Sequence, residues 1–261
     1  MDEPGPRGVN TNTPNVARMY DYFLGGKDNF AADRAAAEKI LSVFPDTPIA
    51  AQANREFMRR AVRYLADAGV DQFLDIGSGL PTRGNVHEIV NTGANVTYVD
   101  YDPMVLSHAN ALLGGAPNVA VIQADLRRPR EIIDHPDLGL DLSRPVALLV
   151  VAILHFVPDE AEPYDIVAEF REAMAPGSYL VLSHLTSEGV PEEFVRAGRE
   201  AYKGATAPMV PRSRAGILRF FDGFELVDPG LAWMSKWRPD DPNVPRSHGF
   251  AGVARKDQPR P

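Results

Sequence analysis

Cysteine is absent from this chain of 261 residues, which excludes disulfide bonds and zinc sites with thiolate ligands. Long apolar runs are also absent. The longest covers residues 146–154, whereas a helix that spans a bilayer needs about 20 apolar residues. Residues 1–10 are acidic and rich in proline and glycine, unlike the basic start and apolar stretch of a signal peptide. We therefore expect a cytoplasmic protein that makes no membrane contact.

Positive charge is scarce. The formal net charge is −8, and an acidic surface repels the phosphates of nucleic acids. The only tight basic cluster, Arg127, Arg128 and Arg130, lies beside Asp125 and Glu131, which favours a solvated loop. The six histidines show no spacing typical of metal ligands. The sequence thus predicts neither a nucleic-acid partner nor a metal site.

The chain is expected to form one structural domain with a helical extension at its N-terminal end. Residues 1–12 predict a disordered tail. Residues 13–68 carry apolar side chains at helical spacing, which predicts an extension of three helices at residues 13–25, 33–43 and 54–68. Residues 69–261 form the expected core.

Short apolar segments alternate with helical segments from residue 72 onward. Five of them are typical of buried strands: residues 72–76, 95–99, 119–123, 146–153 and 179–183. Helices between consecutive strands imply right-handed crossovers and a parallel sheet. Two later segments, residues 224–227 and 249–255, have no clear helix between them and would pair antiparallel. The predicted fold class is therefore α/β, a doubly wound, seven-stranded, mostly parallel sheet with a C-terminal antiparallel strand pair.

The first expected strand contains Asp75 and ends in the turn Gly77, Ser78 and Gly79. Glycines let the backbone approach a ligand closely, and the N-terminus of the following helix favours anionic groups. A dinucleotide fingerprint needs a third glycine here, and residues 80–82 contain none. The acidic side chain suits a ligand with an amino group better than a pyrophosphate. The motif favours S-adenosylmethionine, and a purely structural tight turn is the alternative.

Two further acidic residues follow the next two expected strands. Asp100 lies 23 residues after the first glycine of the turn, near the spacing of about 20 residues at which an acidic side chain meets ribose hydroxyls. Asp102 competes for this role but is better placed to cap the next helix, and Tyr101 between them is a further candidate contact. Asp125 can accept a hydrogen bond from an adenine amino group while Leu126 packs on the ring. A loop aspartate is the alternative for Asp125.

His155 follows the fourth expected strand, at the edge of the sheet where open α/β folds bind ligands. Its imidazole can be neutral near pH 7 and could act as a general base. A structural hydrogen bond that shapes the pocket is an equally good interpretation.

These motifs resemble those of class I S-adenosylmethionine-dependent methyltransferases. More narrowly, the chain resembles a bacterial family once known as a domain of unknown function and now called S-adenosyl methyltransferase. The resemblance runs from about residue 13 to residue 255 and is carried by ARMYDYFLGGKDNF (17–30), QFLDIGSGLPT (72–82), NVHE (85–88), YVDYDP (98–103), ADLRRP (124–129), LHFVPD (154–159) and PGSYLVLSH (176–184). It implies a Rossmann-like, seven-stranded fold that binds S-adenosylmethionine. Asp75, Gly77 and Gly79 would lie at the methionyl part, Asp100 at the ribose and Asp125 at the adenine.

Residues 17–30, the stretch specific to the narrower family, predict a lid over the cofactor. Arg18 and Lys27 can donate hydrogen bonds to the cofactor's carboxylate, and Tyr20, Tyr22 and Phe30 can keep water from its sulfonium. The alternative is a helix that only plugs one edge of the sheet.

Together these features predict an S-adenosylmethionine-dependent methyltransferase. Its acceptor is unidentified and is expected to be a small molecule bound between the lid and residues 205–214. Two alternatives stay open, a protein that binds S-adenosylmethionine without catalysis and a nicotinamide-dependent oxidoreductase. The sequence leaves the acceptor atom and the oligomeric state open.

Overall fold

The computed structural model describes residues 9–81, 84–90, 93–113 and 116–257, and the side chains of Leu112 and Leu113 are not described. Most of the predicted disordered tail, residues 1–8, lies outside the described residues. Residues 9–12 form an irregular segment, in which the Asn10 side chain donates a hydrogen bond to the Thr13 hydroxyl.

The sheet confirms the predicted α/β class. Five parallel strands, β1 (Gln72–Ile76), β2 (Asn95–Asp100), β3 (Val119–Gln123), β4 (Ala147–Val151) and β5 (Tyr179–Leu185), continue into the antiparallel strands β8 (Gly249–Lys256) and β6 (Phe224–Leu226). The strand order is β3-β2-β1-β4-β5-β8-β6. An eighth strand, β7 (Ala232–Trp233), pairs with β8 off this path. Its two residues are too few to produce the alternating pattern by which a strand is predicted.

The helices are α1 (Val16–Phe23), α2 (Ala31–Val43), α3 (Thr47–Asp67), α4 (Val86–Ile89), α5 (Pro103–Leu113), α6 (Pro129–Ile133), α7 (Pro163–Ala173), α8 (Glu192–Ala201) and α9 (Arg214–Leu218). The third helix begins seven residues before its predicted start at Asn54, because Pro48 suits a first helical turn and Ala50 and Ala51 extend the buried stripe.

The basic cluster is not the simple solvated loop that the sequence predicted. Arg130 lies within α6, which Pro129 starts, and pairs with Glu169 of α7. Arg127 pairs with Asp125 at the end of β3. All three arginine side chains are exposed to solvent, as predicted; Arg127 and Arg128 pair with acidic residues of the same stretch, and Arg130 pairs with Glu169 from a distant part of the chain.

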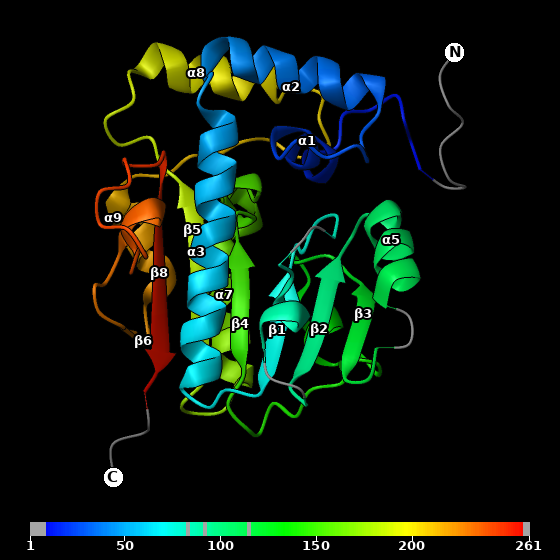
Figure 1. Cartoon of the computed structure of the whole chain (residues 1–261), viewed down its shortest axis with the longest axis vertical. Coiled ribbons are helices and arrows are strands. Elements are labelled where there is room, and N and C mark those ends of the chain that lie inside the picture. The colour runs from blue at the N-terminus through cyan, green and yellow to red at the C-terminus, as the bar shows by residue number, and fades with distance from the viewer. Residues whose placement is uncertain (1–8, 82–83, 91–92, 114–115, 258–261) are drawn as a thin grey trace.

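Helices cover both faces of the sheet, as expected for a doubly wound fold (Figure 1). On one face, α3 contributes Phe57, Ala61 and Leu65 to a core shared with α4, α5 and Trp237. On the other face, α6, α7 and α9 pack on the second side of the same strands. Trp237 is buried against the sheet and has no exposed surface.

The carboxyl ends of the parallel strands point toward α1, α2 and α8, which lie together across that edge of the sheet (Figure 1). α2 packs against both α1 and α8. Further along the chain, the Thr206 backbone N–H donates a hydrogen bond to the Pro14 carbonyl oxygen. The segment before α1 and the loop after α8 therefore form one cover over the strand ends. Among the described residues, no helix is both long and apolar enough to cross a membrane.

Trp237 provides a test of this packing. Its ring meets the Phe57 ring edge-on, with centroids 5.4 Å apart, and it is enclosed between α3 and the sheet. Trp237→Ala should lower the free energy of unfolding by about 3–5 kcal/mol, measured by urea denaturation. Trp233→Ala, at a half-buried position on β7, is the matched control and should cost clearly less. Equal losses in the two variants would contradict the assignment.

Candidate active site

A groove runs along the carboxyl ends of β1, β2 and β4, beneath α1. It begins in a cavity of about 710 Å³ whose walls come from the turn after β1, the end of β2, the loop after β4, α1 and α3. A second hollow of similar volume continues from it toward the end of β3 and shares Gly77, Asp100 and Tyr101 with it. The groove therefore lies where open α/β sheets bind their ligands.

The turn after β1 is held against β2. Gly77 and Gly79 adopt φ angles of 69° and 66°, in the left-handed region that favours glycine. A Cβ atom on Gly77 would lie 2.6 Å from the Ile153 side chain, so this position requires glycine. The Gly77 and Ser78 backbone N–H groups donate to the Val99 carbonyl oxygen, at 2.8 and 3.2 Å. The packing against Ile153 and the hydrogen bonds to β2 thus account for the shape of the turn. The turn also places main-chain atoms in the wall of the groove.

Two carboxylates on adjacent strands face this groove. The Asp100 side chain accepts hydrogen bonds from the backbone N–H groups of Gly79 and Asp102, both at 3.0 Å. Burial nonetheless raises the pKa of Asp100 to about 6. Burial raises the pKa of Asp75 to about 7, and the Asp100 charge adds to this while Arg55 opposes it. Without a ligand, burial disfavours the charged form of both carboxyl groups. A cationic or hydroxyl-rich ligand would favour their charged forms.

Asp125 and Leu126 line the continuation of the groove below the end of β3. Partial burial disfavours the Asp125 charge, but hydrogen bonds from Arg127 outweigh it and hold the pKa of Asp125 below its usual range. Asp125 is therefore ionised near pH 7, whereas burial keeps Asp75 partly protonated there. The structure brings Asp75, Asp100 and Asp125 to one continuous hollow, with Tyr101 lining both of its halves.

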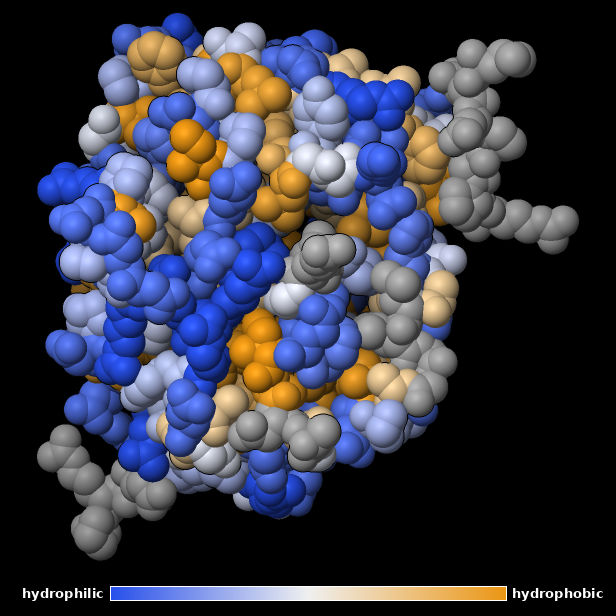
Figure 2. Space-filling view, viewed as in Figure 1, coloured by the Kyte–Doolittle hydropathy of each residue, from blue (hydrophilic) through white to orange (hydrophobic). Residues whose placement is uncertain are grey.

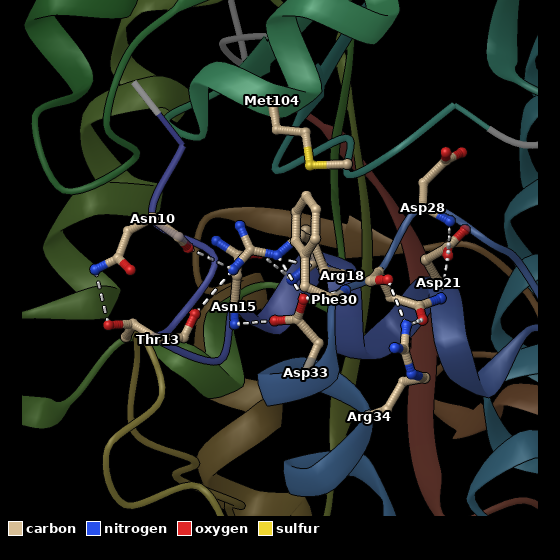
Figure 3. A network of polar contacts seen from close by, with 12 residues as sticks. Asn10, Thr13, Asn15, Arg18, Asp21, Asp28, Phe30, Asp33, Arg34 and Met104 are labelled. Atoms are coloured by element: carbon tan, nitrogen blue, oxygen red, sulfur yellow. Dashed lines mark hydrogen bonds and ion pairs between the residues drawn. The ribbon is translucent and has the colours of Figure 1, made fainter. Parts of the chain in front are cut away.

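Arg18 lies beneath the groove wall in a buried network instead of lining the groove (Figure 3). Its Nε donates to Asp33 at 2.7 Å, and its Nη2 donates to the carbonyl oxygens of Asn10 and Thr13. The Asp33 carboxylate also accepts the Asn15 backbone N–H at 2.8 Å. The network orders the start of α1, because it gathers the segment before the helix and the start of α2 around one guanidinium group.

Tyr22 and Lys27, two other predicted cofactor contacts, are not brought to the groove either. The Tyr22 hydroxyl donates a short hydrogen bond to Glu38 of α2. Lys27 is exposed beyond the end of α1. Helical rotation explains the difference, since Val16 and Tyr20 are the residues whose face of α1 turns toward the groove.

Sequence reasoning missed a chain of hydrogen bonds that joins α1, α3 and β5 along the groove. The Ser183 hydroxyl accepts the Ala152 backbone N–H at 2.9 Å and donates to Asn54 Oδ1 at 2.5 Å. Asn54 Nδ2 donates to the Tyr20 hydroxyl at 2.9 Å, which donates to the Ala51 carbonyl oxygen at 3.0 Å. A buried polar residue on an apolar helical stripe, as Asn54 is, was the one available signal.

His155 lines a neighbouring cavity of about 520 Å³ and does not line the groove itself. Burial, with His184 and Arg212 nearby, lowers the pKa of His155 well below its usual range, so the ring is neutral. Its Nδ1 accepts the Leu185 backbone N–H at 3.4 Å, which leaves the proton on Nε2. This geometry favours the structural interpretation of His155 over a general base.

Arg212 holds the loop that carries His155. Its guanidinium donates to the carbonyl oxygens of Leu154 and Val157 at 3.0 and 2.9 Å and to Asp159 at 2.5 Å. It also donates to His184 Nε2 at 3.0 Å, and burial lowers the pKa of His184 to about 3. Within the described part of the chain, no group of three or more His, Asp or Glu side chains could hold a metal ion.

Comparisons with known proteins agree with this arrangement. The family model described as S-adenosyl methyltransferase matches residues 2–257. A curated Mycobacterium marinum protein, provisionally named an S-adenosyl-L-methionine-dependent methyltransferase, is 30% identical over 162 residues, which are 59% of this chain. The matched region spans about half, 49%, of that relative's length.

Two solved structures are similar over nearly the whole chain. One, from Thermobifida fusca and provisionally named a methyltransferase, is 43% identical with a TM-score of 0.90 and covers 97% of this chain and 98% of its own. The other, a DUF574 family protein from Streptomyces avermitilis, is 42% identical with a TM-score of 0.89 and covers 94% and 98%. The N-methyltransferase NodS from Bradyrhizobium japonicum, at 12% identity and a TM-score of 0.51 over 78% of this chain and 97% of its own, shares the fold.

The Arg18 network leads to a prediction about α1. Arg18→Met leaves Asp33 buried without its cation, which should cost about 3–5 kcal/mol of unfolding free energy. Hydrogen exchange of residues 16–23 should accelerate. Arg130→Met, which breaks the exposed pair with Glu169, should cost only about 0–1 kcal/mol. Unchanged exchange in α1 of the Arg18 variant would refute its role in ordering that helix.

Proposed function

Since the chain belongs to the S-adenosyl methyltransferase family, we propose that it transfers a methyl group from S-adenosylmethionine to a small-molecule acceptor. The observation that carries this proposal is that Asp75, Asp100 and Asp125 open onto one groove at the carboxyl ends of three parallel strands. S-adenosylmethionine supplies a methyl group on a positively charged sulfur. On transfer the sulfur keeps the electron pair of the broken bond, a lone pair of the acceptor forms the new bond, and any acceptor proton leaves to solvent.

The groove fits this cofactor on its own evidence. Asp75 and Asp100 are held partly protonated by burial near pH 7, as expected for carboxylates that await cationic or donor groups of a ligand. Gly77 and Gly79 offer main-chain surface without a Cβ at the groove, and the missing Cβ of Gly77 also leaves room for the Ile153 side chain. The hollow runs from the turn after β1 to Asp125 and Leu126 after β3, so its lining includes all three carboxylates.

We assign the cofactor contacts as follows. Asp75, with the backbone of Gly77, Ser78 and Gly79, would hold the amino-acid part. Asp100 would accept hydrogen bonds from the ribose hydroxyls, beside Tyr101. Asp125 would accept from the adenine amino group, and Leu126 would pack on the ring.

The protein's own contribution to the reaction is positioning and the exclusion of water. Val16 and Tyr20 of α1 and Phe156 of the loop after β4 wall the groove near Asp75. Holding two reactants in line can supply about 7–11 kcal/mol of the barrier. Tyr20 stays fixed by its hydrogen bonds to Asn54 and Ala51, so this wall is ordered before any ligand binds.

The acidic chain favours a small molecule over a nucleic acid as the acceptor, because its net charge of −8 would repel phosphates. Family membership counts against the nicotinamide-dependent oxidoreductase. Turnover separates an enzyme from a binding protein: release of S-adenosylhomocysteine with an acceptor mixture supports catalysis. Binding without any such release would favour the non-catalytic alternative.

Asp100→Ala should weaken binding of S-adenosylhomocysteine. Hydrogen bonds to a charged group contribute about 1.5–3 kcal/mol, so the dissociation constant should rise about 10- to 100-fold in isothermal titration calorimetry. Asp134→Ala, at an exposed position after α6, is the control and should bind normally. An unchanged constant in a folded Asp100 variant would remove this residue from the site.

Affinity for S-adenosylmethionine should rise with pH between about 6 and 8. The bound cation favours ionised Asp75, whose pKa is raised to about 7 in the free protein, so binding releases a proton. Below that pKa the dissociation constant should fall up to about tenfold per pH unit. Asp75→Asn should bind more weakly and lose the step near pH 7, and the step from Asp100 near pH 6 should persist.

The same substitution has an opposite effect on the free protein, which controls for unfolding. A carboxyl group whose pKa is higher in the folded than in the unfolded protein lowers the free energy of unfolding as the pH rises from the unfolded pKa to the folded pKa. Asp75→Asn avoids this loss, so its melting temperature should exceed that of the wild type at pH 8. An equal pH dependence of cofactor affinity in both proteins would exclude the assigned role of Asp75.

A further inference from the structure

Two hollows connect the groove with the outer surface between α2 and α8. The cavity of about 520 Å³ that contains His155 shares Val16, Tyr20, Asn54, Ala152 and Phe156 with the groove. Beyond it lies a cavity of about 620 Å³ whose lining comes from the ends of α2, α3 and α8 and from the loop after β5. The two outer cavities share a further set of lining residues, namely Thr47, Ala50, Leu185 and Tyr202. We call these two cavities the channel.

The buried hydrogen-bonding side chains that border the groove lie at the inner end of the channel, whereas the polar residues of its outer cavity are Thr47, Thr186, Tyr202 and His248. At the inner end, the hydrogen-bond chain of Ser183, Asn54 and Tyr20 borders the groove. An amide nitrogen carries two N–H groups, and the Tyr20 hydroxyl uses one of those of Asn54. The inner end can therefore bind one polar group of a ligand through neutral donors.

The channel has no permanently charged side chain among the described residues, and its one exposed histidine, His248, lies at the mouth, 4.0 Å from Asp46. Its lining contains no Asp, Glu, Lys or Arg. His155 and His184 at its inner end are neutral, because burial and the neighbouring Arg212 guanidinium lower the pKa of each ring. The Arg212 guanidinium donates hydrogen bonds to two carbonyl oxygens and to Asp159. A charged ligand body would lose its hydration here without a counter-charge, which is costly.

The outer end is mostly apolar and open. Ile40, Phe44, Val195 and Met209 line it. Next to these residues, Phe194 and Ile49 are 43% and 57% exposed, and the Phe194 ring lies 6.3 Å from that of Phe44. Hydrophobic surface is visible over the start of α3, below α2 and α8 (Figure 2). An apolar ligand would thus meet apolar surface from the mouth inward.

We propose that the channel selects the acceptor: an uncharged small molecule with an apolar body, which enters between α2 and α8 and presents one polar head group beside Tyr20 and Asn54 at the cofactor groove. The proposal rests on the proposed function, because the channel leads to a methyl donor only if S-adenosylmethionine binds in the groove. It adds the chemical class of the acceptor and the route by which it reaches the reacting methyl.

Two fluorescent probes that share one aromatic framework test the class. N-phenyl-1-naphthylamine is neutral, and 8-anilino-1-naphthalenesulfonate adds a single sulfonate. The neutral probe should bind the full chain saturably, and the sulfonate should bind at least tenfold more weakly. Saturating S-adenosylhomocysteine should leave the neutral probe bound, because the two occupy different cavities. Equal binding of both probes, or displacement of the neutral one by S-adenosylhomocysteine, overturns the proposal.

Two pairs of variants test the route. Ala50→Phe narrows the passage between the two cavities, and Gln52→Phe adds the same ring at an exposed position of the same helix. Val195→Trp blocks the mouth from the half-exposed face of α8, with Arg196→Trp as its exposed neighbour. Ala50→Phe and Val195→Trp should each weaken the neutral probe at least tenfold, and their controls should not.

Calorimetry with S-adenosylhomocysteine keeps the two proposals apart and reports whether each variant is folded. If S-adenosylhomocysteine fails to bind the wild type, the proposed function fails, whatever the probes do. If it binds all variants normally and neither blocking substitution changes the affinity of the neutral probe, the channel proposal is wrong and the proposed function stands. Should Ala50→Phe not fold, Val195→Trp decides, because its side chain replaces one at the surface.

Discussion

The buried pair of Arg18 and Asp33 is the interaction on which the site depends. It joins the segment before α1 to the start of α2, and Arg18 also approaches Asp102 of the core at 3.7 Å. A guanidinium with these carboxylates and two carbonyl oxygens around it is well compensated, as a buried charge must be. The pair therefore fixes α1 over the strand ends, and α1 forms the wall of both the groove and the inner channel (Figure 3).

Beneath that wall, a groove lined by carboxylates lies next to a channel lined by uncharged side chains. The groove collects three carboxylates, and two of them have pKa values raised by burial. The channel beside it has no Asp, Glu, Lys or Arg among the described residues that line it, and its two buried histidines, His155 and His184, are kept neutral. Tyr20 and Asn54 stand at the boundary, hydrogen-bonded to each other. A site divided in this way suits a cationic donor on one side and an uncharged acceptor on the other.

The loop after β4 is the other fixed part of the boundary. Ala152 has a φ angle of 57°, a left-handed conformation that is unfavourable for a residue with a Cβ, and its N–H bonds to Ser183. Arg212 holds the next residues of this loop by their carbonyl oxygens. A strained residue that is held on both sides gives the wall between groove and channel one defined shape.

The sequence by itself determined the sheet and the acidic rim. Parallel strands joined by helices place their carboxyl ends along one edge, so Asp75, Asp100 and Asp125 had to lie near one another once the strands were recognised. It could not determine which way α1 turns, because Arg18, Tyr20 and Tyr22 lie within five consecutive residues of one short helix. Arg18 is drawn to Asp33, Tyr22 to Glu38, and only Tyr20 reaches the groove. Likewise, Asn54 accepts a hydrogen bond from Ser183, which lies 129 residues away in the chain. The Nδ1 atom of His155 accepts a hydrogen bond from the Leu185 backbone N–H, so its lone pair is not available to act as a base. Such contacts join residues distant in the chain and leave no periodic pattern in it, so only the tertiary structure decided where the channel runs and what lines it.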